Sequence, residues 1–163
     1  MKNLVQLNMS CSRISRFGEE FKSMENLKFL NLSGCKFLAQ SPNLSGSPNL
    51  EFLNLSYCKS LKKVHRSVGS LKKLVDLNLE RCSNLVRLPG EVNWRSLRSI
   101  NLDYCTRLES FPEIEGEMKY MTSMSLSNTA IKALPSSIGY LINLELLVLS
   151  GCRNLREFIL RHL

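Results

Sequence analysis

A nine-residue phrase recurs along the whole chain at a nearly constant spacing. Residues 27–35 read Leu-Lys-Phe-Leu-Asn-Leu-Ser-Gly-Cys, and residues 50–58 read Leu-Glu-Phe-Leu-Asn-Leu-Ser-Tyr-Cys. Copies begin at residues 4, 27, 50, 74, 97, 121 and 144, in steps of 23 or 24 residues. A period of this length indicates one supersecondary unit per copy, and each unit must stack on its neighbours to bury its apolar side chains. The repeat therefore predicts an elongated solenoid.

The leucine spacing inside the phrase is typical of a leucine-rich repeat. In the copy at residues 27–35, Leu30 and Leu32 alternate with outward positions such as Phe29, which is the period of a strand with one buried face. The sequence predicts a leucine-rich-repeat solenoid of the α/β horseshoe class. It should be a right-handed curved stack of about seven parallel strands, with short helical or 3-10 turns and loops on the convex side. The strands are expected near residues 5–9, 28–32, 51–55, 75–79, 98–102, 122–126 and 145–149.

The repeats are expected to fill residues 1–158 as one domain, and residues 159–163 are expected to form a tail. Neither the start at Met1 nor this tail offers the polar cap that terminal repeats normally carry. We therefore expect both ends to be uncapped, as in a piece of a longer protein.

Five of the six cysteines occupy the same position of the repeat. Equivalent positions of stacked turns lie about 4.8 Å apart, so these side chains should form one column under the turn after each strand. No C-x-x-C pair is present, so we expect reduced, buried thiols rather than a zinc site or a disulfide framework. Such thiols suit a reducing compartment. Cys11 falls one place too early, and the column comprises Cys35, Cys58, Cys82, Cys105 and Cys152.

Apolar residues three and six positions before the next copy mark the convex side. Val68 with Leu71, and Ile138 with Leu141, show a spacing of three that favours a short helical turn on the back of the sheet. Trp94, the only tryptophan, falls in the column of Leu71, so we expect it in the core rather than stacked on a ligand. An asparagine recurs on the concave side and is interpreted as structural. It is found as Asn8, Asn31, Asn54, Asn78 and Asn101.

The chain has a formal net charge of +8, which favours acidic partners in a general way. Residues 59–73 contain six bases and no acid, whereas residues 109–117 contain four acids and no base. The basic block is either a solvated flank of the repeats or a contact for a partner, and the sequence leaves both interpretations open. The candidate contact residues in this block are Lys59, Lys62, Lys63 and Arg66.

The outward column of the predicted sheet carries two neighbouring aromatic residues. Phe29 and Phe52 should lie side by side on the concave face, where exposed apolar surface often marks an interaction site. Acidic residues follow on the same face, so the sequence predicts a mixed patch with an apolar anchor. The alternative, equally open, is that the rings only cover the neighbouring strands. The acidic candidates are Asp76, Glu80 and Asp103.

The sequence offers no pattern for catalysis or for a cofactor. Its two histidines, His65 and His162, have no patterned nucleophile or carboxylate partner. Neither a phosphate-binding G-x-x-x-x-G-K-[ST] loop nor a G-x-S-x-G elbow occurs. No apolar run reaches the roughly 18 residues of a membrane span. We expect a non-enzymatic protein without cofactor or metal, whose partner is another protein and not a specific nucleic acid.

Three segments of the sequence resemble one protein family. Residues 134–141 read Leu-Pro-Ser-Ser-Ile-Gly-Tyr-Leu, residues 108–114 read Leu-Glu-Ser-Phe-Pro-Glu-Ile, and residues 126–135 contain Thr-Ala-Ile followed by Leu-Pro. These phrases resemble the leucine-rich-repeat region of plant intracellular immune receptors of the TIR-NBS-LRR disease-resistance family. The resemblance extends over residues 1–158. Because the Toll-like and nucleotide-binding domains of that family are absent from the chain, it resembles a truncated receptor.

The resemblance implies a role in plant defence signalling. The repeats would recognise pathogen effectors, or pack on the receptor's own nucleotide-binding domain and hold it autoinhibited, in the cytoplasm or the nucleus. Two alternatives come from other classes. An extracellular leucine-rich-repeat receptor or inhibitor ectodomain would favour asparagine at the cysteine position, and the repeats of a ubiquitin-ligase substrate adaptor tend to be longer.

Overall fold

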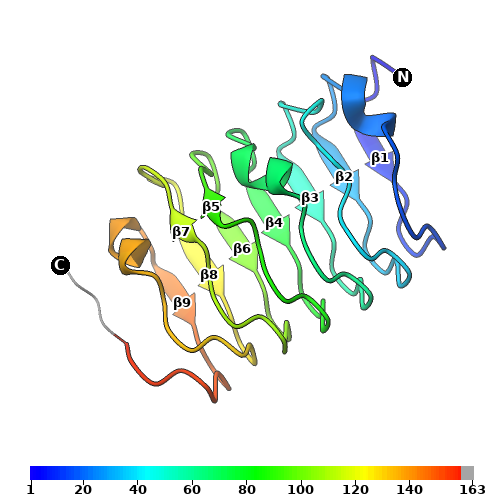
Figure 1. Cartoon of the computed structure of the whole chain (residues 1–163). Coiled ribbons are helices and arrows are strands. Elements are labelled where there is room, and N and C mark those ends of the chain that lie inside the picture. The colour runs from blue at the N-terminus through cyan, green and yellow to red at the C-terminus, as the bar shows by residue number, and fades with distance from the viewer. Residues whose placement is uncertain (159–163) are drawn as a thin grey trace.

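The computed structural model describes residues 1–158, and it confirms the solenoid. Seven three-residue strands form one parallel sheet in the order β1-β2-β3-β4-β6-β8-β9, with one strand from each turn of the chain (Figure 1). Equivalent residues pair across neighbouring strands, as Phe29 does with Phe52. The strands are β1 Gln6–Asn8, β2 Phe29–Asn31, β3 Phe52–Asn54, β4 Asp76–Asn78, β6 Ser99–Asn101, β8 Ser123–Ser125 and β9 Leu146–Val148.

Each strand is centred where the sequence places it but is one residue shorter at either end than expected. The recurring asparagine explains the early end of the strand. The side chain of Asn31 accepts a hydrogen bond from the backbone N–H of Ser33 at 3.0 Å, which draws the chain into a turn. Asparagines at the same place in β3, β4 and β6 make the same bond at 2.9 Å. The column is therefore structural, and each amide bonds within its own turn rather than to the next asparagine.

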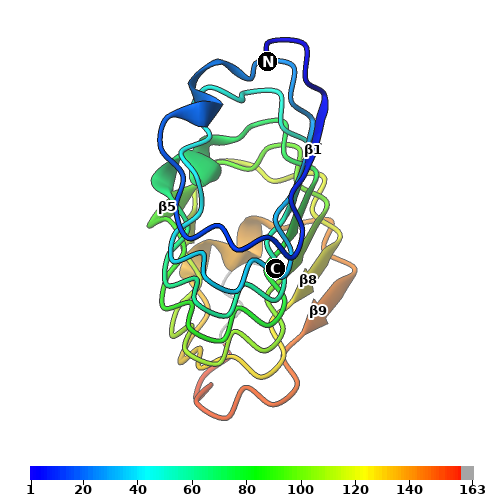
Figure 2. The same ribbon diagram turned by 90° about the vertical axis from the view of Figure 1, so that its right-hand side faces the viewer.

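The core lies between the sheet and the convex side of the coil (Figure 2). Inward side chains such as Leu30, Leu53 and Leu77 are at most 2 % exposed. In the last turn, Leu144 and Leu147 are only half-buried, because within the described residues they pack on one neighbouring turn instead of two. Burial in this fold is thus supplied by neighbours in the stack.

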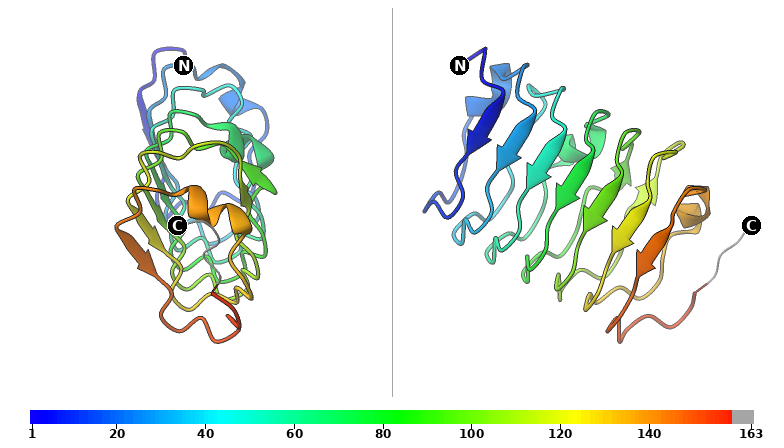
Figure 3. Two further views of the ribbon diagram at one scale, coloured as in Figure 1. Left: turned by 90° about the vertical axis from the view of Figure 1, so that its left-hand side faces the viewer. Right: turned by 180° about the vertical axis from the view of Figure 1, so that it is seen from behind.

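The convex side is less regular than the sheet. Three 3-10 helices cover part of it, as expected: η1 Glu20–Ser23, η2 Arg66–Ser70 and η3 Ser136–Tyr140 (Figure 3). Between η2 and η3 the chain instead forms a two-stranded parallel sheet that the sequence analysis did not predict, from β5 Glu91–Val92 and β7 Glu113–Ile114. Val92 and Trp94 are both buried at a spacing of two, which requires an extended chain at this point.

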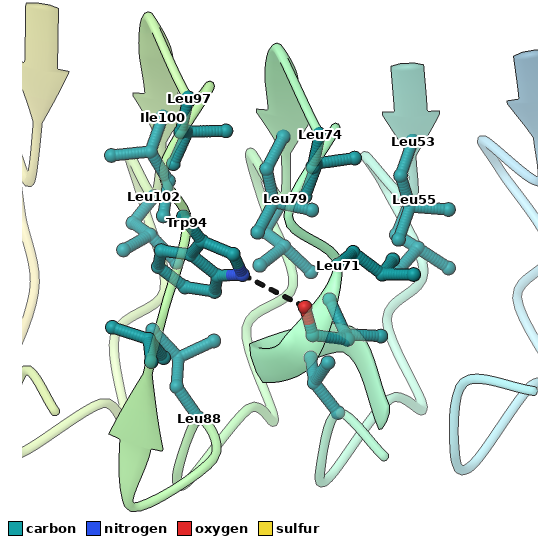
Figure 4. Close-up of a cluster of buried hydrophobic side chains, with 14 of the residues drawn as sticks. Leu53, Leu55, Leu71, Leu74, Leu79, Leu88, Trp94, Leu97, Ile100 and Leu102 are labelled. Carbon is teal, nitrogen blue, oxygen red and sulfur yellow. Dashed lines mark hydrogen bonds between the residues drawn. The ribbon is translucent and has the colours of Figure 1, made fainter. Parts of the chain in front are cut away.

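Trp94 lies in the core, as the sequence predicts. Its side chain is 0 % exposed and packs among leucines of three neighbouring turns (Figure 4). The indole Nε1 donates a hydrogen bond to the backbone carbonyl of Val68 at 2.8 Å. Val68 belongs to η2, so this bond ties one convex turn to the next. A buried indole needs such an acceptor, which accounts for the geometry.

The cysteine column is buried in the centre of the molecule, and its thiols are reduced. Cys35, Cys58, Cys82 and Cys105 are each 0 % exposed, and each thiol donates to a backbone carbonyl of the preceding turn at 3.0–3.3 Å. Desolvation raises the pKa of Cys58 and of Cys105 to about 12, and it raises the pKa of Cys82 as well. Cys152 continues the column, since its thiol donates to the Leu126 carbonyl at 3.0 Å, but it is only partly buried in the last described turn.

We expect alkylation of the native protein to separate the thiols by position. Cys11 is exposed and should react first, whereas the four buried thiols should react only when the chain opens. A pKa near 12 lowers the reactive thiolate fraction at neutral pH about a thousandfold relative to an ordinary cysteine. Iodoacetamide pulses followed by peptide mass spectrometry would measure the rates. Rapid native labelling of Cys58 or Cys82, or a disulfide between neighbouring turns, would contradict the column.

Candidate protein-binding surfaces

Phe29 and Phe52 form a stacked pair on the concave face. Their ring centroids lie 4.8 Å apart with an angle of 4° between the ring planes. Each side chain is still 37 % exposed, although the rings cover one face of each other. Phe29 and Phe52 occupy the same position of neighbouring repeats, and the parallel strands pair them in register. Their side chains therefore leave the sheet side by side, which allows the rings to stack. The pair, called here the aromatic pair, thus covers its neighbouring strand and still presents apolar surface to solvent.

Of the three acidic candidates, only Asp76 lies beside the aromatic pair, and Asp76 and Asp103 are both engaged within the solenoid. Asp76 continues the row of Phe52 and accepts a hydrogen bond from the hydroxyl of Ser99 on the next strand. Asp103 accepts from the Ser125 hydroxyl at 2.6 Å and from the Ser127 backbone N–H at 2.7 Å. These carboxylates therefore join consecutive turns and remain half-buried. Glu80 lies at the edge of the sheet, where its carboxylate contacts the Tyr57 hydroxyl and the Arg81 guanidinium.

The basic block from residue 59 to residue 73 does not form one flank, contrary to the sequence analysis. Lys59, Lys62 and Lys63 are exposed on the connection that follows β3, whereas Arg66 is exposed as the first residue of η2 on the convex side. Residues 72–73 come just before β4 and so lie at the opposite edge. Because one repeat travels once around the coil, fifteen consecutive residues cannot stay on one side.

A hollow of about 660 Å³ opens on the convex side between η2 and residues 89–91. His65 lines it, and its Nδ1 accepts from the Ser67 backbone N–H at 3.2 Å as the cap of η2. Partial burial first, and then the charges of Arg66 and Lys63, lower the pKa of His65. Glu91 is the one carboxylate among the residues that line this hollow, and it makes no hydrogen bond or ion pair with His65. The hollow therefore holds no carboxylate–histidine pair of the kind that a general base needs. Within residues 1–158, no group of three His, Cys, Asp or Glu side chains could hold a metal ion.

A column of residues with positive φ lies at the end of each strand and is not predicted from the sequence. One residue in each turn, directly before the cysteine position, has a φ between 56° and 72°. This left-handed conformation costs a side-chain-bearing residue about 1–2 kcal/mol, so glycine or asparagine is expected there. Gly34, Asn128 and Gly151 were the available signal. The full column is Cys11, Gly34, Tyr57, Arg81, Tyr104, Asn128 and Gly151.

Comparison with known proteins agrees with the geometry. A family model for the leucine-rich repeats of RPS4B-like disease resistance proteins matches residues 93–160, and a general leucine-rich-repeat model matches residues 26–47. A solved leucine-rich-repeat protein of Leptospira interrogans superposes with a TM-score of 0.63 at 22 % identity, over 98 % of this chain and 49 % of its own. The chain therefore contains leucine-rich repeats and has the fold of a leucine-rich-repeat solenoid.

Two further solved structures are more distant from this leucine-rich-repeat protein. The functional domain of InlJ from Listeria monocytogenes, which includes a cysteine ladder, gives a TM-score of 0.48 at 14 % identity over 97 % of this chain and 46 % of that one. The internalin InlF from the same species gives 0.31 at 14 % identity, over 91 % and 67 %. The chain spans about half the length of the first two structures. No curated protein matches it.

Leucine-rich repeats are binding scaffolds, and the exposed surfaces above are the parts of this leucine-rich-repeat protein that a partner could reach. None of the helices found among the described residues has the length and apolar character needed to cross a membrane.

Proposed function

We propose that this leucine-rich-repeat protein is a non-enzymatic protein-recognition module of the plant disease-resistance receptor class. The match of residues 93–160 to RPS4B-like repeats supports the class. Its partner is a pathogen effector, or the nucleotide-binding domain of the same receptor, and it acts in defence signalling. The reduced thiol column supports a cytoplasmic or nuclear location, because such thiols persist in reducing compartments.

The exposed aromatic pair is the observation that carries the proposal. Aromatic side chains are rigid and apolar, and buried aromatic anchors account for much of the binding free energy in protein interfaces. Phe29 and Phe52 each keep 37 % of their surface exposed, and no described segment covers them. Asp76, which pairs with Phe52 across the sheet, supplies a polar group next to the rings, as the rim of an interface does. The concave face around the aromatic pair is thus proposed as the recognition surface.

Replacing both Phe29 and Phe52 with alanine should weaken partner binding by about 2 kcal/mol or more, roughly thirtyfold in Kd. The fold should survive, because both rings face solvent and the inward leucines are untouched. The variant would be placed in a full-length receptor of this class, and effector-triggered defence would be scored in plant leaves. Loss of the response would indicate effector recognition, whereas a response without effector would indicate a lost autoinhibitory contact.

The matched control is Tyr140→Ala, which removes an aromatic ring that is 60 % exposed on the convex side. This variant should behave as the unaltered receptor in both assays. If the double variant also does so, the aromatic pair is not the recognition surface.

A further inference from the structure

We propose that one edge of the solenoid binds an acidic protein segment through a ladder formed by Tyr57, Arg81 and Tyr104. This edge lies beyond the carboxyl ends of the strands, toward which the arrows point in Figure 1. It is separate from the aromatic pair, whose rings lie on the sheet itself. The proposed partner is recognised by its negative charge and by side chains that pack on the tyrosine rings.

Charge is the first observation in favour of this partner. The connections that follow the first four strands, residues 11–17, 34–41, 57–65 and 81–88, are called here the basic edge. They contain eight Lys or Arg residues and no Asp or Glu. Among the described residues, Arg81 is the only one of these eight with a carboxylate partner. The excess of positive charge ends at the fifth turn, where Glu109 forms an ion pair with Lys132 of the next turn. A long unpaired row of one sign attracts a partner of the opposite sign.

The ladder gives the basic edge an anchor. The guanidinium carbon of Arg81 lies 4.3 Å from the centre of the Tyr104 ring and 5.8 Å from that of Tyr57. The two tyrosines are 45 % and 40 % exposed, so part of each ring remains open to a partner although Arg81 stacks on both. Tyrosine and arginine are the residue types enriched at the centres of protein interfaces. Stacking holds these long side chains in place before any partner arrives, which reduces the entropy lost on binding.

Backbone strain is the second observation, and it is independent of charge. Tyr57, Arg81 and Tyr104 all have a φ of 58–60°, a left-handed conformation that is rare for bulky residues. Their backbone N–H groups donate to the next turn at 2.7–2.8 Å, which fixes this conformation whatever the side chain. Glycine satisfies the same position in the second turn, at Gly34. A costly residue where glycine suffices indicates that the side chain itself is used.

A hollow supplies room for a side chain of the partner. It measures about 600 Å³ at the amino-terminal end of the basic edge, and Arg13, Lys36, Phe37 and Tyr57 line it. Phe37 is 52 % exposed, with the Arg13 guanidinium carbon 5.4 Å from its ring centre. The hollow and the ladder share Tyr57, so one extended segment could contact both.

Carboxylates next to the ladder favour a protein over a nucleic acid. Glu80 Oε1 lies 3.5 Å from the Tyr57 hydroxyl and 3.5 Å from Arg81 Nε. Asp103 directly precedes Tyr104 in the chain. A continuous phosphate backbone laid over the ladder would be repelled by both carboxylates. A protein segment can place its acidic residues on the bases and its own donors on Glu80 and Asp103.

The test uses the full chain and the double variant Arg81→Gly, Tyr104→Gly. Glycine removes both side chains and adopts a positive φ without strain, so the variant should melt at the same temperature as the wild type or higher. The probe is a fluorescent oligoglutamate peptide at low ionic strength. An oligouridylate of equal length is measured in the same way, to compare a nucleic acid with a peptide. Oligoglutamate binding should weaken by about tenfold or more, which corresponds to about 1.4 kcal/mol.

The matched control is Arg98→Ala, Tyr120→Ala. This pair lies before the strands, at the opposite edge, with the guanidinium carbon 5.9 Å from the ring centre. It removes the same charge and the same ring, so oligoglutamate should bind this control within about twofold of wild type. If the glycine variant fails to fold, Tyr104→Asn replaces it, since Asn128 occupies the equivalent position in the next turn.

Three results would overturn the proposal. Equal losses in the glycine variant and the control would show that only net charge matters. Unchanged binding in the glycine variant would remove the ladder as an anchor. Tighter binding of oligouridylate than of oligoglutamate, lost in the glycine variant, would make the edge a nucleic-acid site. The Phe29→Ala, Phe52→Ala variant should bind oligoglutamate as wild type does, so this surface and the concave recognition surface are tested independently.

Discussion

Replacing Trp94 with alanine should lower the free energy of unfolding by about 3–5 kcal/mol, the range for deleting a large buried aromatic side chain. The indole is 0 % exposed and fills the space between the sheet and the convex strands (Figure 4). Alanine would leave a cavity there and would remove the bond to the Val68 carbonyl. Each turn of a solenoid is stabilised chiefly by its neighbours, so a cavity in the fourth turn should weaken the turns on both sides.

Urea unfolding followed by circular dichroism would measure this effect. Tryptophan fluorescence cannot be used, because Trp94 is the only tryptophan and the variant lacks it. Trp94→Phe is the matched control, because it keeps most of the apolar volume and removes only the hydrogen bond. The carbonyl of Val68 still accepts from the Leu71 N–H at 3.3 Å, so this control should cost only about 1 kcal/mol beyond its smaller volume. An alanine variant within about 1 kcal/mol of wild type would show that the convex side relaxes around the gap.

The sheet and its surfaces were predictable because one repeat fixes them. Steps of 23 or 24 residues place Phe29 opposite Phe52, and the structure pairs these two residues. The same register places Cys58 over Cys35 and Cys82 over Cys58, which put the thiols in the core. The alternation of leucines predicted which side chains point inward. Successive strand residues point to opposite faces, so only one of the two possible orientations buries the leucines.

The convex side and the edges were less predictable, because they depend on small local differences. Val68 and Leu71 stand three residues apart and form a 3-10 turn, whereas Val92 and Trp94 stand two apart and form an extended segment. The ladder was missed for another reason. Tyr57 and Arg81 have low preference for a positive φ, so only their alignment with Gly34 indicates the turn they occupy. The type of side chain therefore does not predict this backbone conformation, because the neighbouring turns impose it.

The basic block shows how a linear pattern can mislead in a solenoid. Lys59 and residues 72–73 are close in sequence, yet one coil of the chain carries them to opposite edges. Bases from different turns, such as Lys36 and Lys59, occupy equivalent positions at one edge although 23 residues separate them. A charge pattern on this fold is read across the repeats rather than along one of them.

Gly46→Ala should destabilise the protein by about 3 kcal/mol or more, the upper end of the cost of overpacking. Gly46 lies in the convex loop of the second turn, which has no helix and passes directly over η1. A Cβ built on Gly46 would overlap the backbone of Lys22 and the carbonyl oxygen of Phe21. Backbone atoms cannot rotate away as a flexible side chain can, so either η1 or the loop must move. Phe21 is 2 % exposed, and its displacement would open the core of the first turn.

Gly90→Ala is the matched control, since a Cβ there meets no atom within 4 Å and the φ of Gly90 is not in the left-handed range. Alanine should be neutral or should stabilise by up to about 1 kcal/mol, because it restricts the unfolded chain. Thermal and urea unfolding of both variants would give the comparison. Hydrogen exchange would locate the change, with protection lost first around η1 in the Gly46 variant. Equal stability of the two variants would mean that the second convex loop does not rest on η1, and that the first turn is held by the sheet alone.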